Sequence, residues 1–187
     1  MRKFLHLSGI ICLMLISMNA MAGYQAGYDL NYSQTRSDAF QLEIALNKYN
    51  VQTVNKEGTM YSDIDFPGQV VTKKAGWAEV PYFGIPVQIP ADKNVSVEIT
   101  SIQYEVIRLE HPMLPSRGVI YRNEDPDDIP YQTDPASVTD NWYPENNIRT
   151  STPYIIRNVR GETVFVQPFQ YNAAQQKLRV VKSITVE

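Results

Sequence analysis

Bulky apolar residues recur at every second position in several runs of this chain, and no long helical pattern follows residue 22. They are Phe40, Leu42, Ile44 and Leu46 in one run, and Leu178, Val180, Ile184 and Val186 in another. Successive side chains of a strand point to opposite faces, so this period of two predicts strands with one buried face. A helix would require spacings of three and four residues. The core is therefore expected to form between sheets.

Turn residues separate these strand candidates and predict hairpins. Segments 55–58 (NKEG) and 172–176 (NAAQQ), and a turn at Gly161, each lie between two apolar runs. Glycine adopts the left-handed conformation at low cost, which favours tight turns at Gly58 and Gly161. In the longest strand candidate, Asn94–Leu109, the apolar phase shifts by one residue across Thr100 and Ser101. Such a shift predicts a β-bulge or a bend between sheets.

Segment 76–90, GWAEVPYFGIPVQIP, contains three prolines. Proline donates no backbone hydrogen bond, so we expect extended chain at a sheet edge or crossing between sheets, and no regular inner strand. Trp77 and Tyr82, together with Trp142, could form a platform for a stacked ligand. They could equally fill the core, because large aromatic side chains dominate protein cores.

Short strand candidates with turn punctuation favour an all-β fold, an antiparallel β-sandwich of the jelly-roll type. One domain is expected over residues 23–187, with segment 23–38 either a loose arm or a first edge strand. The sequence stops directly after the last strand candidate. We therefore leave open that the domain is incomplete at its C-terminus.

Residues 1–22 have the three parts of a cleavable signal peptide: the basic Arg2 and Lys3, an apolar run, and Ala20-Met21-Ala22 as the cleavage site. The run is too short for a membrane span, so no membrane anchor is predicted. We expect export through the general secretory pathway to the periplasm, the cell surface or the exterior of a bacterium.

Beyond the signal, the chain lacks the cysteine and the histidine cluster that Cys–His catalysis or a Cys/His metal site would need. Its single cysteine, Cys12, lies in the signal, and His111 is the only histidine that follows it. Neither a Cys–His dyad nor a Cys/His zinc site can form, so this chain is not expected to be an enzyme. The net charge of −3 and the lack of a basic patch argue against nucleic-acid binding. No cofactor is predicted, although Asp63 and Asp65 share a strand face and could bind calcium as well as aid solubility.

The stretch 115–131, PSRGVIYRNEDPDDIPY, is predicted to be a long surface loop because prolines at and near its ends oppose both helix and central strand. Loops longer than about a dozen residues are usually functional or disordered. Arg122 stands just before the acidic residues of this loop and is the side chain that it would present to a partner. Those acidic residues could pair with basic groups on the partner or simply be solvated.

Three ordered motifs resemble the N-terminal prodomain of the gingipain family, which are secreted caspase-like cysteine peptidases. They are PSRGVI at 115–120 with Arg122, Asn123, Pro126 and IPY at 129–131; PYIIRNVRG at 153–161; and Pro168 with QYN at 170–172, followed by LRV at 178–180.

The resemblance implies a β-sandwich prodomain that assists the folding of a gingipain-type catalytic domain and blocks its active site until the prodomain is cut away, in cis or in trans. In arginine-specific members, a substrate-like loop places an arginine in the primary specificity pocket. The matching residue here is Arg122, and Arg117 falls where the family has a variable basic residue. We therefore expect the inhibitory segment to be Ile120, Tyr121, Arg122 and Asn123, supported by Pro115, Gly118, Pro126, Pro130 and Tyr131.

The sequence departs from the family in lacking the catalytic domain with its histidine and cysteine. We therefore expect either a fragment or a freestanding inhibitor. The alternative is a freestanding secreted module that binds a glycan or a peptide, with Trp77, Tyr82 and Trp142 as its aromatic platform.

Overall fold

The computed structural model describes residues 26–67 and 70–187, and the predicted signal peptide lies outside this part of the chain. The strands are β1 (Tyr28–Arg36), β2 (Ala39–Leu46), β3 (Asn50–Lys56), β4 (Thr59–Asp65), β5 (Val70–Val71), β6 (Pro81–Gln88), β7 (Ile99–Arg108), β8 (Trp142–Tyr143), β9 (Ile148–Thr150), β10 (Tyr154–Ile156), β11 (Val159–Val166), β12 (Phe169–Asn172) and β13 (Lys177–Val186). The described residues also contain two 3-10 helices, η1 (Pro126–Asp128) and η2 (Pro135–Ser137). Among the described residues no helix is long and apolar enough to cross a membrane.

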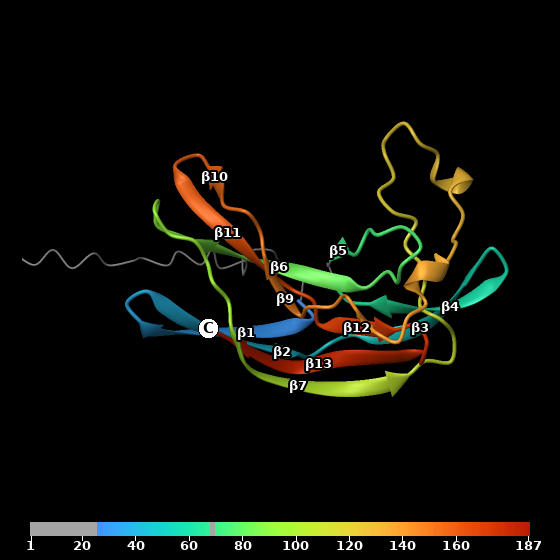
Figure 1. The fold of residues 1–187 in the computed structure, drawn as a ribbon, viewed down its shortest axis with the longest axis horizontal. Helices are drawn as coiled ribbons and strands as arrows, with labels where there is room; N and C mark the ends of the chain where they lie inside the picture. The colour runs from blue at the N-terminus through green and yellow to red at the C-terminus, as the bar shows by residue number, and fades with distance from the viewer. Residues whose placement is uncertain (1–25, 68–69) are drawn as a thin grey trace, which may run out of the picture.

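The larger sheet is centred on β13 (Figure 1). Its order is β1-β2-β13-β12-β8, and β7 pairs with β13 as well. The second sheet has the order β10-β11-β6-β5, with β9 also paired to β11. Strands β3 and β4 form a separate hairpin. All these strand pairs are antiparallel, so the predicted antiparallel all-β fold is confirmed.

The core lies between the two sheets, where the alternating apolar residues of each meet. Leu178, Val180 and Ile184 of β13 are at most 1% exposed, and Phe83 and Val166 of the facing sheet are at most 3% exposed. The apolar residues that recur at every second position in the sequence are thus the ones that the sandwich buries.

Two of the predicted turns are confirmed. Glu57 and Gly58 connect β3 to β4 with φ angles of 53° and 82°, and the Asn55 side chain accepts a hydrogen bond from the Gly58 backbone at 3.0 Å. The hairpin between β12 and β13 also forms as expected. The predicted turn at Gly161 was wrong. Arg157, with φ 59°, takes the turn, and Gly161 lies inside β11 opposite Tyr154.

The phase shift in the longest strand candidate corresponds to a bulge. Ile99 pairs with Val186 and Ser101 with Thr185, which leaves Thr100 as the extra residue. The strand is shorter than expected, however, because β7 begins only at Ile99. At the other end of the chain, segment 23–38 contributes the edge strand β1.

The proline-rich segment is extended, as expected, but the expectation that it contains no regular inner strand was wrong. Strand β6 is a regular eight-residue strand between β5 and β11. Pro86 is opposite Thr163 of β11, whereas β5 accompanies β6 only at Pro81 and Tyr82. Because no described strand flanks the other side of β6 at Pro86, the missing N–H costs the sheet little there.

Candidate functional site

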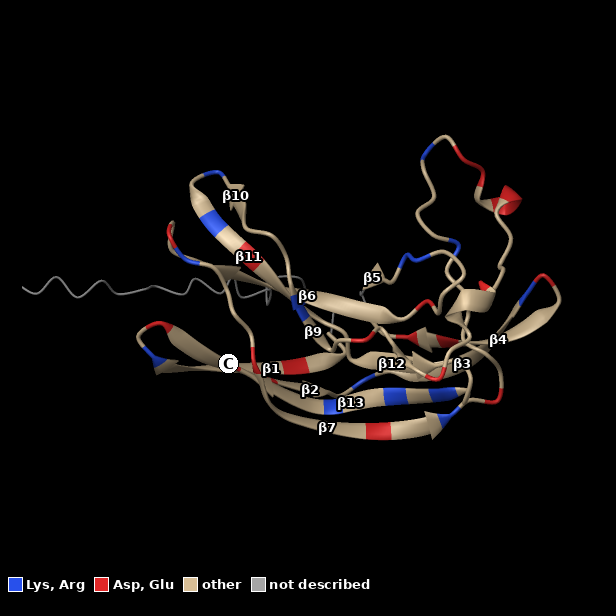
Figure 2. Cartoon of the chain, in the orientation of Figure 1, with Lys and Arg blue, Asp and Glu red and all other residues tan. Residues whose placement is uncertain are grey.

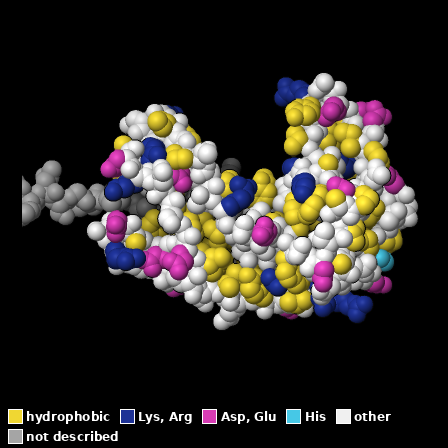
Figure 3. All heavy atoms as spheres, in the orientation of Figure 1, with side chains coloured by type: hydrophobic (Ala, Val, Ile, Leu, Met, Phe, Trp, Pro, Cys, Tyr) yellow, Lys and Arg dark blue, Asp and Glu magenta, His cyan; other side chains and the backbone are white. Residues whose placement is uncertain are grey.

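The segment Pro115–Tyr131 leaves the sandwich as a long loop and contains no strand, as the sequence predicts. In Figure 1 it stands out from the end of the sandwich near the β3–β4 hairpin. In the same orientation, the space-filling view shows this loop and the β10–β11 hairpin as two projections with a hollow between them (Figure 3). The tip of the loop is therefore accessible to a large partner.

A closed turn forms the tip of the loop. The Glu124 backbone N–H donates to the Tyr121 carbonyl at 3.0 Å, and the Tyr121 backbone N–H donates to Glu124 Oε2 at 2.8 Å. Arg122 and Asn123 are the two central residues of this turn, and both are exposed. Within the described part of the chain, the Arg122 guanidinium has no hydrogen bond or ion pair. The turn thus fixes the backbone while leaving the arginine side chain available.

Arg117 joins the two legs of the loop. Its Nη1 donates to the carbonyl oxygens of Pro126 and Ile129, at 2.5 Å and 3.3 Å. Its guanidinium also lies 4.5 Å from the centre of the Tyr131 ring, and Lys56 of the β3–β4 hairpin lies 5.5 Å from the same ring. Arg117 is thus an internal support, whereas Arg122 is displayed.

The base of the loop is held by Gly76. Its backbone N–H donates to the Ser116 carbonyl at 2.8 Å, and its own carbonyl accepts from the Asp134 N–H at 3.0 Å. The Ser116 N–H donates to the Trp77 carbonyl at 2.8 Å, and Ser116 is 2% exposed. One glycine therefore bridges Ser116, just inside the start of the loop, and Asp134, just beyond its end.

We expect Gly76→Ala to lower the free energy of unfolding by about 2 kcal/mol or more. Gly76 has φ 72°, and a Cβ there would lie 2.6 Å from the Asp134 backbone nitrogen. Gly58→Ala is the matched control, because Gly58 has φ 82° with nothing within 4 Å of an added Cβ. Chemical denaturation measures both losses. Equal losses would mean that the close approach to Asp134 has no energetic role.

Figure 2 shows the acidic run of the loop in red. Two of its members form hydrogen bonds within the loop itself. Glu124 closes the tip turn, and Asp125 caps η1 by accepting from the Asp127 N–H at 3.0 Å. Near the base, burial raises the pKa of the Glu79 carboxyl, and the charges of Lys73 and Arg117 oppose that rise. Glu124 and Asp125 thus stabilise local turns whether or not a partner also contacts them.

The three aromatic residues of the alternative platform lie in separate contacts. Trp77 packs against Tyr143, with ring centres 4.8 Å apart, and lies under Lys74. Tyr82 packs against Phe165. Trp142 lies under Arg179, whose guanidinium is 4.0 Å from the ring centre. No described ring contact joins any two of the three.

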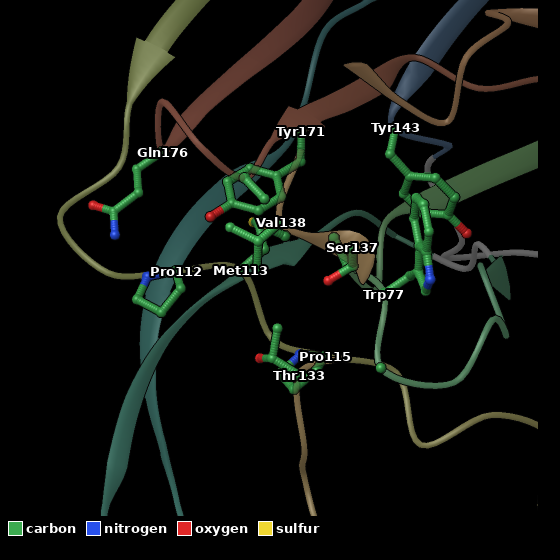
Figure 4. Close-up of a pocket in the computed structure, with 13 residues that line it drawn as sticks. Trp77, Pro112, Met113, Pro115, Thr133, Ser137, Val138, Tyr143, Tyr171 and Gln176 are labelled. Atoms are coloured by element: carbon green, nitrogen blue, oxygen red, sulfur yellow. The ribbon is translucent and has the colours of Figure 1, made fainter. Parts of the chain in front are cut away.

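Figure 4 shows a small pocket beside the base of the loop, with Trp77 and Tyr143 against one another at one end and Tyr171 nearby. The pocket has a volume of about 180 Å³ and includes Gly76 and Pro115 in its lining. The sequence did not reveal it because its walls come from four distant segments.

Asp63, one of the two candidate calcium ligands, accepts a hydrogen bond from Gln52 at 3.1 Å. No group of three or more potential metal ligands occurs among the described residues.

Comparison with known proteins identifies the family of this sandwich and its loop. The family model described as Propeptide_C25 matches residues 30–187. The chain belongs to the Propeptide_C25 family. Gingipain R2 of Porphyromonas gingivalis is 30% identical over an alignment of 151 residues that covers 72% of this chain and 20% of that protein. Lys-gingipain of the same species is 20% identical over 153 residues, 79% of this chain and 9% of the relative.

Two solved structures share the fold of this propeptide. A complex of the Porphyromonas gingivalis RgpB pro- and mature domains matches with a TM-score of 0.76 and 25% identity, covering 88% of this chain and 83% of that one. A structure on the zymogenic latency of gingipain K matches with a TM-score of 0.74 and 18% identity, covering 87% and 98%. The chain spans about a fifth or less of the length of the curated relatives just described. It is a gingipain-type propeptide domain, as the sequence motifs predict.

Proposed function

We propose that this propeptide assists the folding of a secreted, arginine-specific gingipain-type cysteine peptidase and inhibits it by offering Arg122 to its primary specificity pocket. The observation that carries the proposal is the closed turn Tyr121–Glu124, which displays Arg122 at the tip of a supported loop. The gingipain R2 relative supports arginine specificity, because it is 30% identical whereas the Lys-gingipain relative is 20% identical.

The chemistry of an arginine side chain suits this role. A guanidinium can form paired, charge-assisted hydrogen bonds with a carboxylate at the base of a pocket, and a buried pair of this kind is a typical interface hot spot. Arg122 begins exposed and has no competing ion pair in the described part of the chain, so no internal contact must break before it binds.

The loop is also suited to bind without being consumed as a substrate. Its tip is closed by hydrogen bonds across the turn, its legs are joined by Arg117, and its base is held by Gly76. A segment already ordered in this way loses little conformational entropy on docking. A backbone held in a turn also resists the geometry that hydrolysis of its peptide bond requires.

The proposed setting is export through the general secretory pathway, with the catalytic domain reached in cis or in trans. The direct test is inhibition by the purified chain without its predicted signal peptide. We expect dose-dependent inhibition of an arginine-specific gingipain and at least about tenfold weaker inhibition of a lysine-specific one, a difference of roughly 1.4 kcal/mol.

The control in this assay is the chain after heat denaturation, which removes the loop geometry but keeps every arginine. Equal inhibition of both peptidases would contradict arginine specificity. A chain that inhibits neither, but binds saccharides in a manner lost in Trp77→Ala, would replace the proposal with a glycan-binding module.

A further inference from the structure

Arg117 precedes the exposed peptide bond after Arg122, and its partners in the loop all follow that bond. The guanidinium donates to the carbonyls of Pro126 and Ile129 and packs on the Tyr131 ring. Hydrolysis after Arg122 would therefore leave these contacts in place, since none of them depends on the bond that breaks.

The rest of the fold would also hold two such pieces together. Gly76 bonds to Ser116 on one side of the bond and to Asp134 on the other. In the larger sheet, β13 from the second piece lies between β2 and β7 from the first. In the other sheet, β6 from the first piece pairs with β11 from the second. Both sheets thus contain strands from each side of the cut.

We propose that Arg117 is a positioning residue that slows hydrolysis of the bond after Arg122 and keeps both new ends in place once that bond is cut. The reaction adds one water, so Arg122 gains a carboxylate, Asn123 gains an amine, and no other reactant is needed. A latent peptidase would then stay inhibited by a nicked propeptide. This consequence rests on the proposed function, whereas the effect of Arg117 on the loop does not.

Limited proteolysis by an unrelated arginine-specific endopeptidase tests the first part without the gingipain partner. Mass spectrometry of the chain without its predicted signal peptide follows cleavage after Arg122 relative to cleavage after Arg157, an exposed arginine in the β10–β11 turn. We expect the ratio to rise at least about tenfold in Arg117→Ala. The cleavage ratio of Arg117→Lys is expected to lie between those of the wild type and Arg117→Ala, because an ammonium group can still donate to a carbonyl.

A merely structural role for Arg117 is separated from positioning by thermal melting. We expect Arg117→Ala to melt within a few degrees of the wild type, because the residue lies in a loop outside the core. An unchanged cleavage ratio would overturn the positioning role. A raised ratio accompanied by a large drop in melting temperature would also overturn it, since general unfolding would then explain the cleavage.

Inhibition by the nicked chains tests the second part. Wild type cut after Arg122 should elute as one species in gel filtration and keep its inhibition of an arginine-specific gingipain within about threefold, whereas nicked Arg117→Ala should lose at least about tenfold. Separation of the wild-type pieces, or equal losses in both proteins, would overturn retention. If intact wild type fails to inhibit while the cleavage ratio still rises, the proposed function fails and the positioning role stands.

Discussion

Replacing Arg122 by alanine is expected to weaken inhibition of an arginine-specific gingipain by at least about tenfold, roughly 1.4 kcal/mol. The substitution removes the guanidinium that would pair with the pocket carboxylate and leaves that carboxylate buried without a partner. The fold should be unaffected, because Arg122 is exposed and the tip turn is closed by Tyr121 and Glu124. The inhibition constant measured with a small arginyl substrate reports the effect.

Arg157→Ala is the matched control, since Arg157 is also an exposed arginine in a turn but lies between β10 and β11. It should inhibit about as well as the wild type. Arg122→Lys adds a test of specificity, because lysine keeps the charge and loses the planar fork. We expect it to inhibit a lysine-specific gingipain better than the wild type does. Equal inhibition by wild type and Arg122→Ala would remove this residue from the mechanism.

Phe169→Ala is expected to lower the free energy of unfolding by about 3–5 kcal/mol. Phe169 is fully buried, and its ring meets those of Tyr49 and Phe66 edge to face, with centres 5.5 Å and 5.4 Å away. The side chain thus joins the larger sheet to the segments that flank the β3–β4 hairpin. Removing it leaves a cavity that close-packed neighbours cannot fill completely.

Chemical denaturation monitored by circular dichroism measures this loss. Tyr121→Ala serves as the control, because the Tyr121 side chain is 64% exposed and its truncation should change stability by no more than about 0.5 kcal/mol. Losses of similar size in the two variants would mean that the Phe169 cluster does not anchor the core.

Local signals in the sequence predicted the elements that depend on local chemistry. The Glu57-Gly58 turn follows from the preference of glycine for positive φ, and the bulge at Thr100 follows from a change of parity. Gly161 misled the prediction because glycine is also needed where another side chain approaches the backbone. An added Cβ at Gly161 would lie 3.1 Å from the Tyr154 ring.

Features that depend on distant neighbours could not be predicted in this way. Pro86 fits a regular strand because no described strand lies beside it on the side away from β11, and that depends on the pairing of segments. The motifs singled out Arg122 within the candidate site, but the support from Arg117 needs the folded loop. The role of Gly76 requires contact with Ser116, forty positions away in the numbering.

Strand β13 is the last of the described strands to be synthesised, yet it lies at the centre of the larger sheet and pairs with β2, β7 and β12. Until β13 has been synthesised, the larger sheet therefore lacks the strand that joins β2 to β7. Such late, long-range pairing slows folding. We expect the emerging chain to stay open until residues 177–186 are available, which would suit the export proposed above.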